Sequence, residues 1–471
     1  MGKKQDLVVI GGGPGGLVVA SVAAQLGLKV MLVEQSGRLG GDCLHGGCVP
    51  SKTLIHMAHT VHCARTGAEE GLLSAMPEVD FGVAVDRVRQ VIERIQRHDD
   101  PERFRGYGCD VRFGKAVFVN PHQVSVDEDI ITARRFVIAT GSIPAIPPIP
   151  GLEEAGFETN ETIFSRRELP QRLAILGGGP VGVELAQAFR RFGSEVTIVE
   201  KADRLLPQGD KELSSALREV LESENIRIMT AAGVTAVRRE GHSRQLVLAD
   251  GGTVECDRIL LAAGRRPATH GMGLVAAGIE FGKSGITVDR RLRTSQKHVF
   301  AIGDVCGPYQ FTHMAEYQAG IALANIAFRV PKKTDYRVVP RVVYTDPEAA
   351  TVGMTEAEAV EQGIRFSVAR YPMAEIDRAI TDGNPAGFLK LLVSKGRVLG
   401  ASLFGAHAGE LIHELALAMQ LKAKVREISD LVHAYPTYAQ VHRRAANSSY
   451  AHLLKSRKIR LLVWLLGRIL P

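Results

Sequence analysis

The sequence predicts an α/β fold, and three observations support this prediction. A pattern of strand, glycine-rich turn, helix and second strand ending in an acidic residue occurs near the start of the chain, and the same pattern recurs later. Two cysteines separated by four residues follow the first copy directly. With 471 residues and 45% hydrophobic content, the chain is long enough for about three domains. We therefore expect two Rossmann-like dinucleotide-binding domains among them.

The first copy begins with an apolar strand at 7–10. A glycine-rich turn and a helix reaching about Leu26 follow, and the second strand is at 29–33. The turn has the GxGxxG spacing, in Gly11, Gly13 and Gly16. Such glycines allow a tight turn, close approach of the backbone to a pyrophosphate and packing of helix on strand. Glu34 ends the second strand, where an acidic residue accepts hydrogen bonds from a ribose 2′-OH.

The second copy has its strands at 173–176 and 195–199, and it implies a second dinucleotide. Its glycines are Gly177, Gly179 and Gly182. Glu200 ends the second strand, and its negative charge opposes a 2′-phosphate, so NAD is favoured over NADP. Lys201 and Arg204 lie close enough to keep NADP open, although two solvated surface charges are the simpler interpretation.

The cysteine pair lies in the segment GGDCLHGGCVPSKT at 40–53. We expect 44–47, between Cys43 and Cys48, to be a short flexible loop that lets the sulfurs meet, since a disulfide needs Cβ atoms within roughly 4.5 Å. Pro50 suits the first turn of a following helix. Unpaired N–H groups and the helix dipole favour a thiolate there, so Cys48 is the better thiolate candidate. Inert thiols or a static disulfide are the alternative, which the adjoining nucleotide pattern disfavours.

Further motifs make the chain resemble a known family. They are ATGSIP at 139–144, AAGRRPAT at 262–269, AIGDV at 301–305 and YTDPEAATVGMTE at 344–356. Together with the Cys-x4-Cys segment they resemble, over nearly the whole length, the class I pyridine nucleotide-disulfide oxidoreductases, the family of dihydrolipoamide dehydrogenase, glutathione reductase and mercuric reductase. The segments at 98–114 and 373–383 are most similar to the mercuric-reductase-like branch. The resemblance implies an FAD domain, an NAD domain and a C-terminal α+β dimerisation domain.

The resemblance also implies FAD at the first glycine turn, the nicotinamide nucleotide at the second, and a redox-active disulfide. Electrons would pass from nicotinamide to flavin to the disulfide. Cys48 matches the charge-transfer sulfur against the flavin, and Cys43 matches the interchange sulfur that meets the acceptor. Lys52, one helical turn after Cys48, would stabilise negative charge on the reduced flavin. Glu184 matches the acid that pairs with this lysine, so that neither charge is buried alone.

Other positions match the cofactor contacts of the family. Asp304 matches the residue that contacts the FAD ribitol. The helix that begins near His313 would direct its positive end at the flavin pyrimidine. The remaining matched cofactor positions are Lys52, Ala116, Thr140, Gly141 and Gly264. The cofactors implied are FAD and NAD, with NADP open.

The chain departs from the family pattern near its C-terminal end. Members that act on thiols or disulfides carry a His-Glu pair there, which reaches the active site of the other subunit. In HAYPTYAQ at 433–440, Tyr435 takes the place of the base and Gln440 that of the acid, while His433 matches a histidine that is not the base. A phenol with an ordinary pKa of about 10 is a poor base at neutral pH. Efficient dihydrolipoamide oxidation is therefore not expected, and mercuric reductase likewise has tyrosine at the base position.

The chain also lacks the vicinal cysteine pair of mercuric reductase. We expect the other cysteines to be small buried side chains: Cys63, Cys109, Cys256 and Cys306. One cluster of metal-ligating residue types follows the cysteine pair: His56, His59, His62 and Cys63. An exposed helical face is the commoner explanation for it, so we predict no metal site. His45 either tunes the thiolate or is a spacer, which is simpler. Pro180 stands where glutathione-reductase-like members have tyrosine, which disfavours glutathione.

We expect the domains to be an FAD-binding domain at 1–150, an NAD(P)-binding domain at 151–270, a central domain at 271–334, an interface domain at 335–452 and a basic amphipathic tail at 453–471. No signal peptide precedes the first strand, and no apolar run reaches the roughly 18 residues of a membrane span. A cytoplasmic enzyme is therefore expected, and the resemblance implies a homodimer. The net charge of +7 is widely spread, and nothing predicts nucleic-acid binding.

The tail combines basic and apolar residues. Its basic residues before the only tryptophan, Trp464, are Lys455, Arg457, Lys458 and Arg460. Such a segment could lie on an anionic membrane, which would place the protein peripherally at the inner face. An extra helix that covers the dimer or a neighbouring domain is slightly favoured.

Three functions follow from these patterns. The leading hypothesis is an FAD-dependent NAD(P)H oxidoreductase that passes electrons through Cys43 and Cys48 to a disulfide, metal ion or similar acceptor, as mercuric reductase does. The first alternative is a dihydrolipoamide dehydrogenase with an atypical proton relay through Tyr435. The second alternative is an NADH electron-transfer component docked on a membrane or a larger complex.

Overall fold

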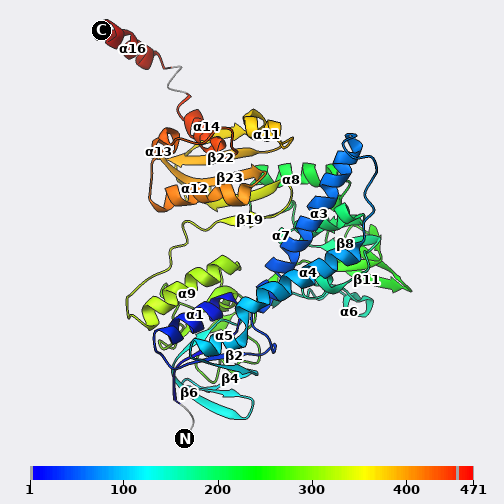
Figure 1. Ribbon diagram of the computed structural model, residues 1–471, viewed down its shortest axis with the longest axis vertical. Helices are drawn as coiled ribbons and strands as arrows, with labels where there is room; N and C mark the ends of the chain where they lie inside the picture. The colour runs from blue at the N-terminus through cyan, green and yellow to red at the C-terminus, as the bar shows by residue number, and fades with distance from the viewer. Residues whose placement is uncertain (1–3, 452–455, 470–471) are drawn as a thin grey trace. The chain divides into compact units, whose positions relative to one another are not determined.

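The computed structural model describes residues 4–451 and 456–469, and it divides into two compact units (Figure 1). Unit 1 comprises residues 1–177, 191–194 and 235–334, and unit 2 comprises residues 178–190, 195–234 and 335–471. Lys455 of the predicted tail lies outside the described residues. Within the described ranges, no helix has both the length and the apolar character needed to cross a bilayer.

Unit 1 is built on one large sheet with the strand order β3-β2-β1-β6-β5-β4, and β18 also pairs with β6. Its strands are β1 (Lys4–Ile10), β2 (Val30–Glu34), β3 (Cys109–Phe113), β4 (Ala116–Asn120), β5 (Gln123–Val126), β6 (Asp129–Ile138) and β18 (Val299–Ala301). β1, β2, β3, β6 and β18 pair in parallel, whereas β4, β5 and β6 form an antiparallel extension. The predicted strand, turn, helix and strand of the first nucleotide pattern are therefore confirmed.

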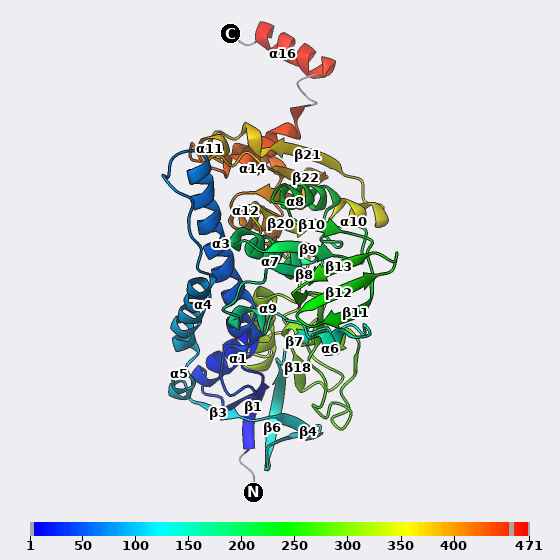
Figure 2. The same ribbon diagram turned by 90° about the vertical axis from the view of Figure 1, so that its right-hand side faces the viewer.

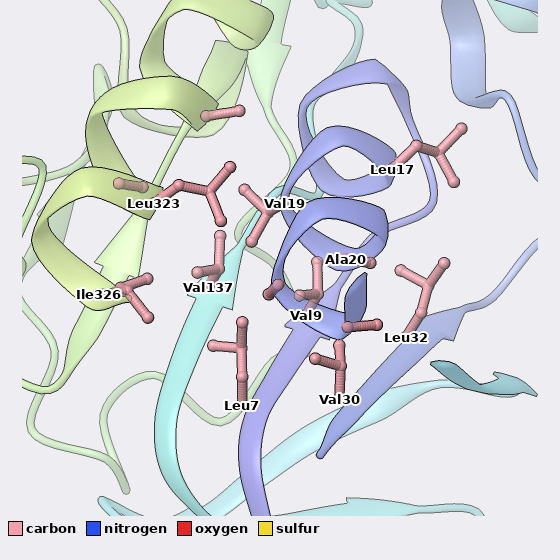
Figure 3. Close-up of a cluster of buried hydrophobic side chains, with 14 of the residues drawn as sticks. Leu7, Val9, Leu17, Val19, Ala20, Val30, Leu32, Val137, Leu323 and Ile326 are labelled. Atoms are coloured by element: carbon pink, nitrogen blue, oxygen red, sulfur yellow. The ribbon is translucent and has the colours of Figure 1, made fainter. Parts of the chain in front are cut away.

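Both faces of this sheet are buried. Leu7 and Val9 of β1 enter a core with the helices α1 and α9, which lie side by side (Figures 1 and 3). Val8 and Ile10 enter a second core on the other face. Consecutive strand residues point to opposite faces, so a strand buried on both sides needs an unbroken apolar run. This requirement explains why the segment at 7–10 shows no alternation of apolar and polar residues.

The helices of unit 1 include the two that carry the cysteine pair. They are α1 (Pro14–Gln25), α2 (Gly41–His45), α3 (Cys48–Glu69), α4 (Phe81–Gln96), α5 (Pro101–Gly106), α6 (Leu152–Ala155) and α9 (Thr312–Ile326). Short strands complete the unit: β7 (Ser142–Pro144), β8 (Arg172–Leu176), β11 (Val234–Glu240), β12 (Ser243–Leu248), β13 (Thr253–Cys256), β14 (Arg258–Leu261), β15 (Arg265–Pro267), β16 (Phe281–Gly282) and β17 (Gly285–Ile286). β8 pairs in parallel with β14, and β11, β12 and β13 form a three-stranded sheet (Figure 2).

Unit 2 contains an antiparallel five-stranded sheet with the order β19-β20-β23-β22-β21. Its strands are β19 (Arg341–Val343), β20 (Glu348–Gly353), β21 (Ser367–Pro372), β22 (Phe388–Ser394) and β23 (Arg397–Gly405). β9 (Glu195–Val199) and β10 (Arg227–Met229) pair with each other in parallel and do not belong to the five-stranded sheet. The helices are α7 (Pro180–Phe192), α8 (Lys211–Ser223), α10 (Glu356–Glu361), α11 (Asp377–Thr381), α12 (Ala408–Gln420), α13 (Val425–Asp430), α14 (Gln440–Ser448) and α16 (Arg457–Ile469). α12 packs against β20 and β23, and α14 packs against β21 and β22.

Candidate active site

The first glycine turn connects β1 to α1 and lies against the end of β6. Gly11 has a φ of +110°, and a Cβ atom there would lie 2.4 Å from the carbonyl oxygen of Ala139. A Cβ atom on Gly16 would lie 1.9 Å from the carbonyl oxygen of Gly11. Both positions therefore require glycine. A Cβ atom on Gly13 would meet no described atom closer than 3.9 Å, so the turn is open beside the start of α1.

The N-terminus of α1 is suited to bind an anion. Gly13 is its N-cap, no described side chain caps the helix, and its first turn contains no acidic residue. The N–H groups of the first turn are therefore left for a ligand, and the helix dipole favours a negative one. No described atom would lie within 4 Å of a Cβ atom on Gly141, which follows β6. These features fit the pyrophosphate of a dinucleotide, as predicted for FAD.

Glu34 supports the glycine turn from the end of β2. Its Oε2 accepts a hydrogen bond from the backbone N–H of Gly12 at 2.6 Å, and its Oε1 accepts one from that of Ser36 at 2.7 Å. The side chain is buried, so these bonds help to compensate a buried charge. Each carboxylate oxygen keeps a second lone pair. A contact between Glu34 and a ribose hydroxyl therefore stays a prediction.

The second glycine turn repeats this arrangement. In unit 2, Oε2 of Glu200 accepts from the backbone N–H of Gly178 at 2.6 Å, and Oε1 accepts from that of Ala202 at 2.7 Å. In unit 1, a Cβ atom on Gly177 would lie 2.3 Å from the carbonyl oxygen of Ala262. The guanidinium of Arg204 donates to the carbonyl of Pro207 at 2.6 Å. This local contact favours a structural role for Arg204, and the preference for NAD over NADP stays a prediction.

Cys48 is the first residue of α3, as predicted, and Pro50 lies in its first turn. The structure holds Cys43 and Cys48 as free thiols, and Cys48 is exposed. The Sγ atom of Cys48 lies 3.3 Å from Oγ1 of Thr312. A hydrogen bond with Cys48 raises the pKa of Cys43, and burial adds to this effect. The proton of the pair is therefore held on Cys43, which favours a thiolate on Cys48.

The predicted flexible loop at 44–47 is wrong in extent. Leu44 and His45 belong to the short helix α2, together with Cys43, and Leu44 is buried. The connection to α3 consists of Gly46 and Gly47 alone. The ring of His45 contacts the carbonyl of Leu39 at 2.9 Å, and burial lowers its pKa. A neutral His45 supplies no positive charge to a thiolate, so the structure supports the spacer interpretation.

A polar network that the sequence analysis missed anchors the redox segment. Asp42, next to Cys43, forms an ion pair with Arg265 at 3.0 Å and accepts a hydrogen bond from the amide of Asn160 at 3.1 Å. Arg265 also donates to the hydroxyl of Ser142 at 2.7 Å, which in turn donates to Asp304 at 2.6 Å. Burial raises the pKa of Asp304. The network thus connects the redox helix α2 to Asp304, the predicted ribitol contact.

Arg265→Met is expected to lower the turnover of acceptor reduction by about tenfold. This loss corresponds to the low end of the free energies of hydrogen bonds to charged groups, because the site is partly exposed. The substitution removes the donor that holds Asp42 and Ser142 together. Steady-state turnover, normalised to bound FAD, is the measurement. Arg266→Met is the matched control, because Arg266 is adjacent and exposed. Equal losses in both variants would show that the network has no positioning role.

The other predicted site residues lie on the elements expected of them. Lys52 is one turn after Cys48 on α3, and His313 is the second residue of α9. Glu184 of α7 is buried, and its Oε1 accepts from the backbone N–H of Tyr344 at 2.9 Å. Lys52 belongs to unit 1 and Glu184 to unit 2, and their pairing stays a prediction. Three further cofactor positions are Ala116 at the start of β4, Thr140 and Gly264, which has a φ of +110°.

Comparison with known proteins gives the family. The pyridine nucleotide-disulphide oxidoreductase model matches residues 5–319, and the model of the corresponding dimerisation domain matches residues 339–446. The chain belongs to this family. Members of the family use FAD and NAD(P), and the dimerisation domain supports a homodimer.

Relatives within the family carry several names. The chain is 37% identical over 464 residues to a dihydrolipoyl dehydrogenase of Thermus scotoductus, covering 95% of this chain and 97% of that protein. It is 33% identical over 447 residues to a mercuric reductase of Lysinibacillus sphaericus, covering 94% and 82%. Among solved structures, it resembles a Cu(II) complex of the HOCl-induced flavoprotein disulfide reductase RclA from Escherichia coli. That match has a TM-score of 0.85 and 31% identity, and it covers 93% of this chain and 98% of the other.

Tyr435 and Gln440 are the residues that the resemblance places at the positions of the family's His-Glu pair. Tyr435 is 69% exposed, and a hydrogen bond to Asp377 raises its pKa. The phenol therefore stays protonated at neutral pH. Gln440 is the first residue of α14. His433 contacts Glu414 at 3.1 Å, a partner that the sequence analysis did not identify.

The remaining cysteines agree in part with the sequence analysis. Cys109 and Cys256 are buried, and burial raises the pKa of each to about 11. Burial raises the pKa of Cys306 to about 12. Cys63 differs, because it is exposed and its sulfur lies 3.3 Å from Nε2 of His59. In the described ranges, the residues His56, His59, His62 and Cys63 do not form a three-ligand metal cluster.

Proposed function

We propose that this protein is an NADH-dependent flavin enzyme that reduces a thiophilic metal ion, such as Hg(II) or Cu(II), at Cys43 and Cys48. One observation carries the proposal. The exposed thiol of Cys48 stands at the N-terminus of α3 with Cys43 as its hydrogen-bond partner. A hydrogen bond with Asp377 meanwhile raises the pKa of the Tyr435 phenol, which makes it a weaker acid. The chain thus offers paired sulfur ligands for a metal ion and a poor proton relay for a disulfide.

The cofactors fit the residues present. FAD would accept a hydride from the nicotinamide and supply electrons to the cysteine pair. The α1 N-terminus would hold the FAD pyrophosphate, and Glu34 would accept from the ribose. Lys52 would place a positive charge near the flavin and Asp304 would hold the ribitol. Glu200 would accept from the NAD ribose.

Proton balance favours a metal ion as acceptor. Reduction of a disulfide by NADH consumes a proton, because two sulfurs leave as thiols: NADH + H⁺ + RSSR gives NAD⁺ + 2 RSH. Reduction of a metal ion consumes none: NADH + Hg(II) gives NAD⁺ + H⁺ + Hg(0). A general acid typically contributes about 10²–10⁴-fold to a step that needs proton transfer. A chain with Tyr435 and Gln440 at the His-Glu positions therefore loses more turnover with a disulfide acceptor than with a metal ion.

The comparisons support the same acceptor class. One relative is named a mercuric reductase, and one similar solved structure is described as a Cu(II) complex. Thiolates are the side chains that bind such soft ions best. The relative named dihydrolipoyl dehydrogenase keeps lipoamide as the alternative acceptor.

The experiment is an anaerobic comparison of electron acceptors. NADH oxidation by the FAD-loaded protein is measured with a thiol complex of Hg(II), with a chelate of Cu(II), and with lipoamide. We expect kcat/KM for a metal acceptor to exceed that for lipoamide by about 10²-fold, the low end of a missing general-acid contribution. Lipoamide turnover equal to or faster than metal turnover would identify a dihydrolipoamide dehydrogenase with an atypical relay. NADPH in place of NADH tests the role of Glu200.

A second proposal concerns the tail. In α16 the six consecutive apolar side chains from Leu461 to Leu466 are 41–62% exposed. The same helix has no acidic residue and carries four basic ones: Arg457, Lys458, Arg460 and Arg468. The Arg468 guanidinium lies 3.8 Å from the centre of the Trp464 ring. Such a helix is suited to the surface of an anionic bilayer.

Deletion of residues 453–471 is expected to abolish sedimentation of the protein with vesicles that contain anionic lipid, and to leave NADH oxidation in solution unchanged. Sedimentation at low and high salt is the measurement, because the attraction of the basic residues is screened by salt. Vesicles of neutral lipid serve as the control. Unchanged sedimentation after the deletion would assign α16 to a protein interface instead.

A further inference from the structure

The structure brings together two histidines and a carboxylate that the sequence analysis did not connect. Glu414 lies on α12, His442 lies on α14, and His433 lies in the segment between α13 and α14. Nε2 of His433 is 3.1 Å from Oε1 of Glu414, and Nδ1 of His442 is 2.9 Å from Oε2. One ligand atom from each residue lies within 4.8 Å of the others. All three residues belong to unit 2.

Both ring nitrogens of His433 face hydrogen-bond acceptors. Nδ1 of His433 lies 3.2 Å from the carbonyl oxygen of Leu431, and Nε2 faces the carboxylate of Glu414. Both neighbours are acceptors, but a neutral imidazole has only one N–H. If Nδ1 donates to Leu431, the lone pair of Nε2 points at a carboxylate. A cation between Nε2 and Glu414 removes that repulsion.

His442 contributes a deeply buried imidazole to the cluster. Its side chain is 1% exposed. Among the described residues, its Nε2 has no hydrogen-bond partner. Burial of an imidazole with one satisfied nitrogen is costly compared with an apolar side chain of similar size. Its Nδ1 faces Glu414, so Nδ1 is the atom that a metal ion beside Glu414 would contact, and Nε2 would carry the proton of the metal-bound ring.

We infer that Glu414, His433 and His442 form a binding site for Zn²⁺ that is separate from the redox cysteines. Zinc takes imidazole and carboxylate ligands at about 2.0–2.2 Å in tetrahedral geometry, which sets neighbouring ligand atoms about 3.3 Å apart. The separations of 2.9 and 3.1 Å between Glu414 and the two rings are near this value, and the ligand atoms of all three residues lie within 4.8 Å of one another. The Nδ1–H of His433 then donates to Leu431, as metal-bound histidines commonly donate to a carbonyl. Glu414 is 28% exposed, so water can supply the fourth ligand.

A bound zinc ion would tie α12 to α14 and fix the segment that joins His433 to α14. Tyr435 lies in this segment, two residues after His433. The zinc site concerns this segment and does not depend on the identity of the electron acceptor. It therefore stands or falls separately from the proposed reduction of metal ions at Cys43 and Cys48.

The test uses full-length, FAD-loaded protein with Cys43→Ser and Cys48→Ser, because the redox thiols would themselves bind zinc. After treatment with a chelator, Zn²⁺ is titrated by calorimetry. We expect one zinc ion per chain, with His442→Asn weakening the affinity by at least about 100-fold, beyond the 10–100-fold typical of losing an outer-shell partner. Asparagine keeps a donor for Glu414, which preserves the fold. His413→Asn is the matched control, because His413 is exposed on α12, next to Glu414.

Zinc should also raise the melting temperature of the parent and of His413→Asn, but not of His442→Asn or Glu414→Gln. X-ray absorption at the zinc edge should show two imidazole ligands. Equal zinc affinity in parent and His442→Asn would overturn the assignment. Loss of binding in His59→Asn instead would overturn it by moving the site to the pair with Cys63, and absence of zinc binding in the parent would overturn it as well.

Discussion

Cys48→Ser is expected to lower the turnover of metal-ion reduction by about 10³-fold or more. A serine hydroxyl stays protonated at neutral pH and is a hard ligand, so it neither binds a soft metal ion nor shares the proton of Cys43. Reduction of bound FAD by NADH should continue, because that step precedes the thiols. Stopped-flow measurement of flavin bleaching, beside steady-state NADH oxidation with Cu(II) or Hg(II), separates the two steps.

Cys63→Ser is the matched control for this prediction. Cys63 is also an exposed thiol on α3, but it is 15 residues further along the helix. Its replacement should leave turnover within about twofold of the parent, as expected for a surface substitution away from the chemistry. Cys43→Ser should resemble Cys48→Ser, since the pair acts as a unit. Full turnover in either redox-cysteine variant would mean that the acceptor takes its electrons without the cysteine pair.

The part of this site that the sequence predicted depends on local rules. The place of Cys48 at the start of α3 follows from Pro50 in the first turn. The glycine turn follows from the steric limits at Gly11 and Gly16. Each of these features depends on residues within a few positions along the chain, or on a neighbouring backbone that leaves no room for a side chain.

The parts that were missed depend on distant residues. Arg265 reaches Ser142 across 123 positions, and Asn160 reaches Asp42 across 118. No periodicity or spacing marks such pairs. The helix α2 was also missed, because only the burial of Leu44 shows that the segment is not a flexible loop. Its neighbours Gly46 and Gly47 made flexibility the better local prediction.

The C-terminal region shows the same limit. The sequence predicted that Tyr435 and Gln440 replace the His-Glu pair, but it could not show that a hydrogen bond with Asp377 raises the pKa of the phenol. His442 drew no attention in the sequence, since 28 residues separate it from Glu414. Only the packing of α12 and α14 in one core brings these two residues together.

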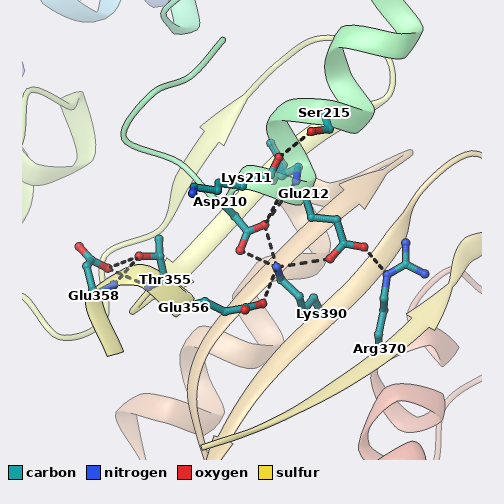
Figure 4. A network of polar contacts seen from close by, with 10 residues as sticks. Asp210, Lys211, Glu212, Ser215, Thr355, Glu356, Glu358, Arg370 and Lys390 are labelled. Atoms are coloured by element: carbon teal, nitrogen blue, oxygen red, sulfur yellow. Dashed lines mark hydrogen bonds and ion pairs between the residues drawn. The ribbon is translucent and has the colours of Figure 1, made fainter. Parts of the chain in front are cut away.

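Lys390→Met is expected to lower the free energy of unfolding by about 3–5 kcal/mol, the cost of removing one partner from a buried ion pair. Nζ of Lys390, on β22, lies 2.7 Å from Asp210, 2.8 Å from Glu356 and 3.4 Å from Glu212 (Figure 4). The side chains of Lys390 and Asp210 are only 5% and 3% exposed. Methionine fills most of the volume but leaves the Asp210 carboxylate buried without its cation. Urea unfolding of the FAD-loaded protein is the measurement.

The difference in stability between the parent and Lys390→Met should depend on pH, in a direction set by the pKa of Lys390. Burial opposes its charge, but hydrogen bonds to Asp210 and Glu356 raise its pKa overall. A group with a raised pKa in the folded state stabilises fully below its unfolded pKa of about 10.4 and loses that contribution as pH rises through the folded value. The parent should therefore lose stability at strongly alkaline pH, whereas Lys390→Met should lose less over the same range.

Two further variants separate charge from packing. Lys390→Met with Asp210→Asn should recover part of the loss, because asparagine removes the buried charge and still caps α8, where Asp210 accepts from the N–H groups of Glu212 and Leu213. Arg370→Met is the matched control. It breaks the ion pair of Arg370 with Glu212 at a side chain that is 47% exposed, so its cost should stay below about 1 kcal/mol. Equal losses in Lys390→Met and in the double variant would show that packing around β22, rather than the unpaired carboxylate, determines the effect.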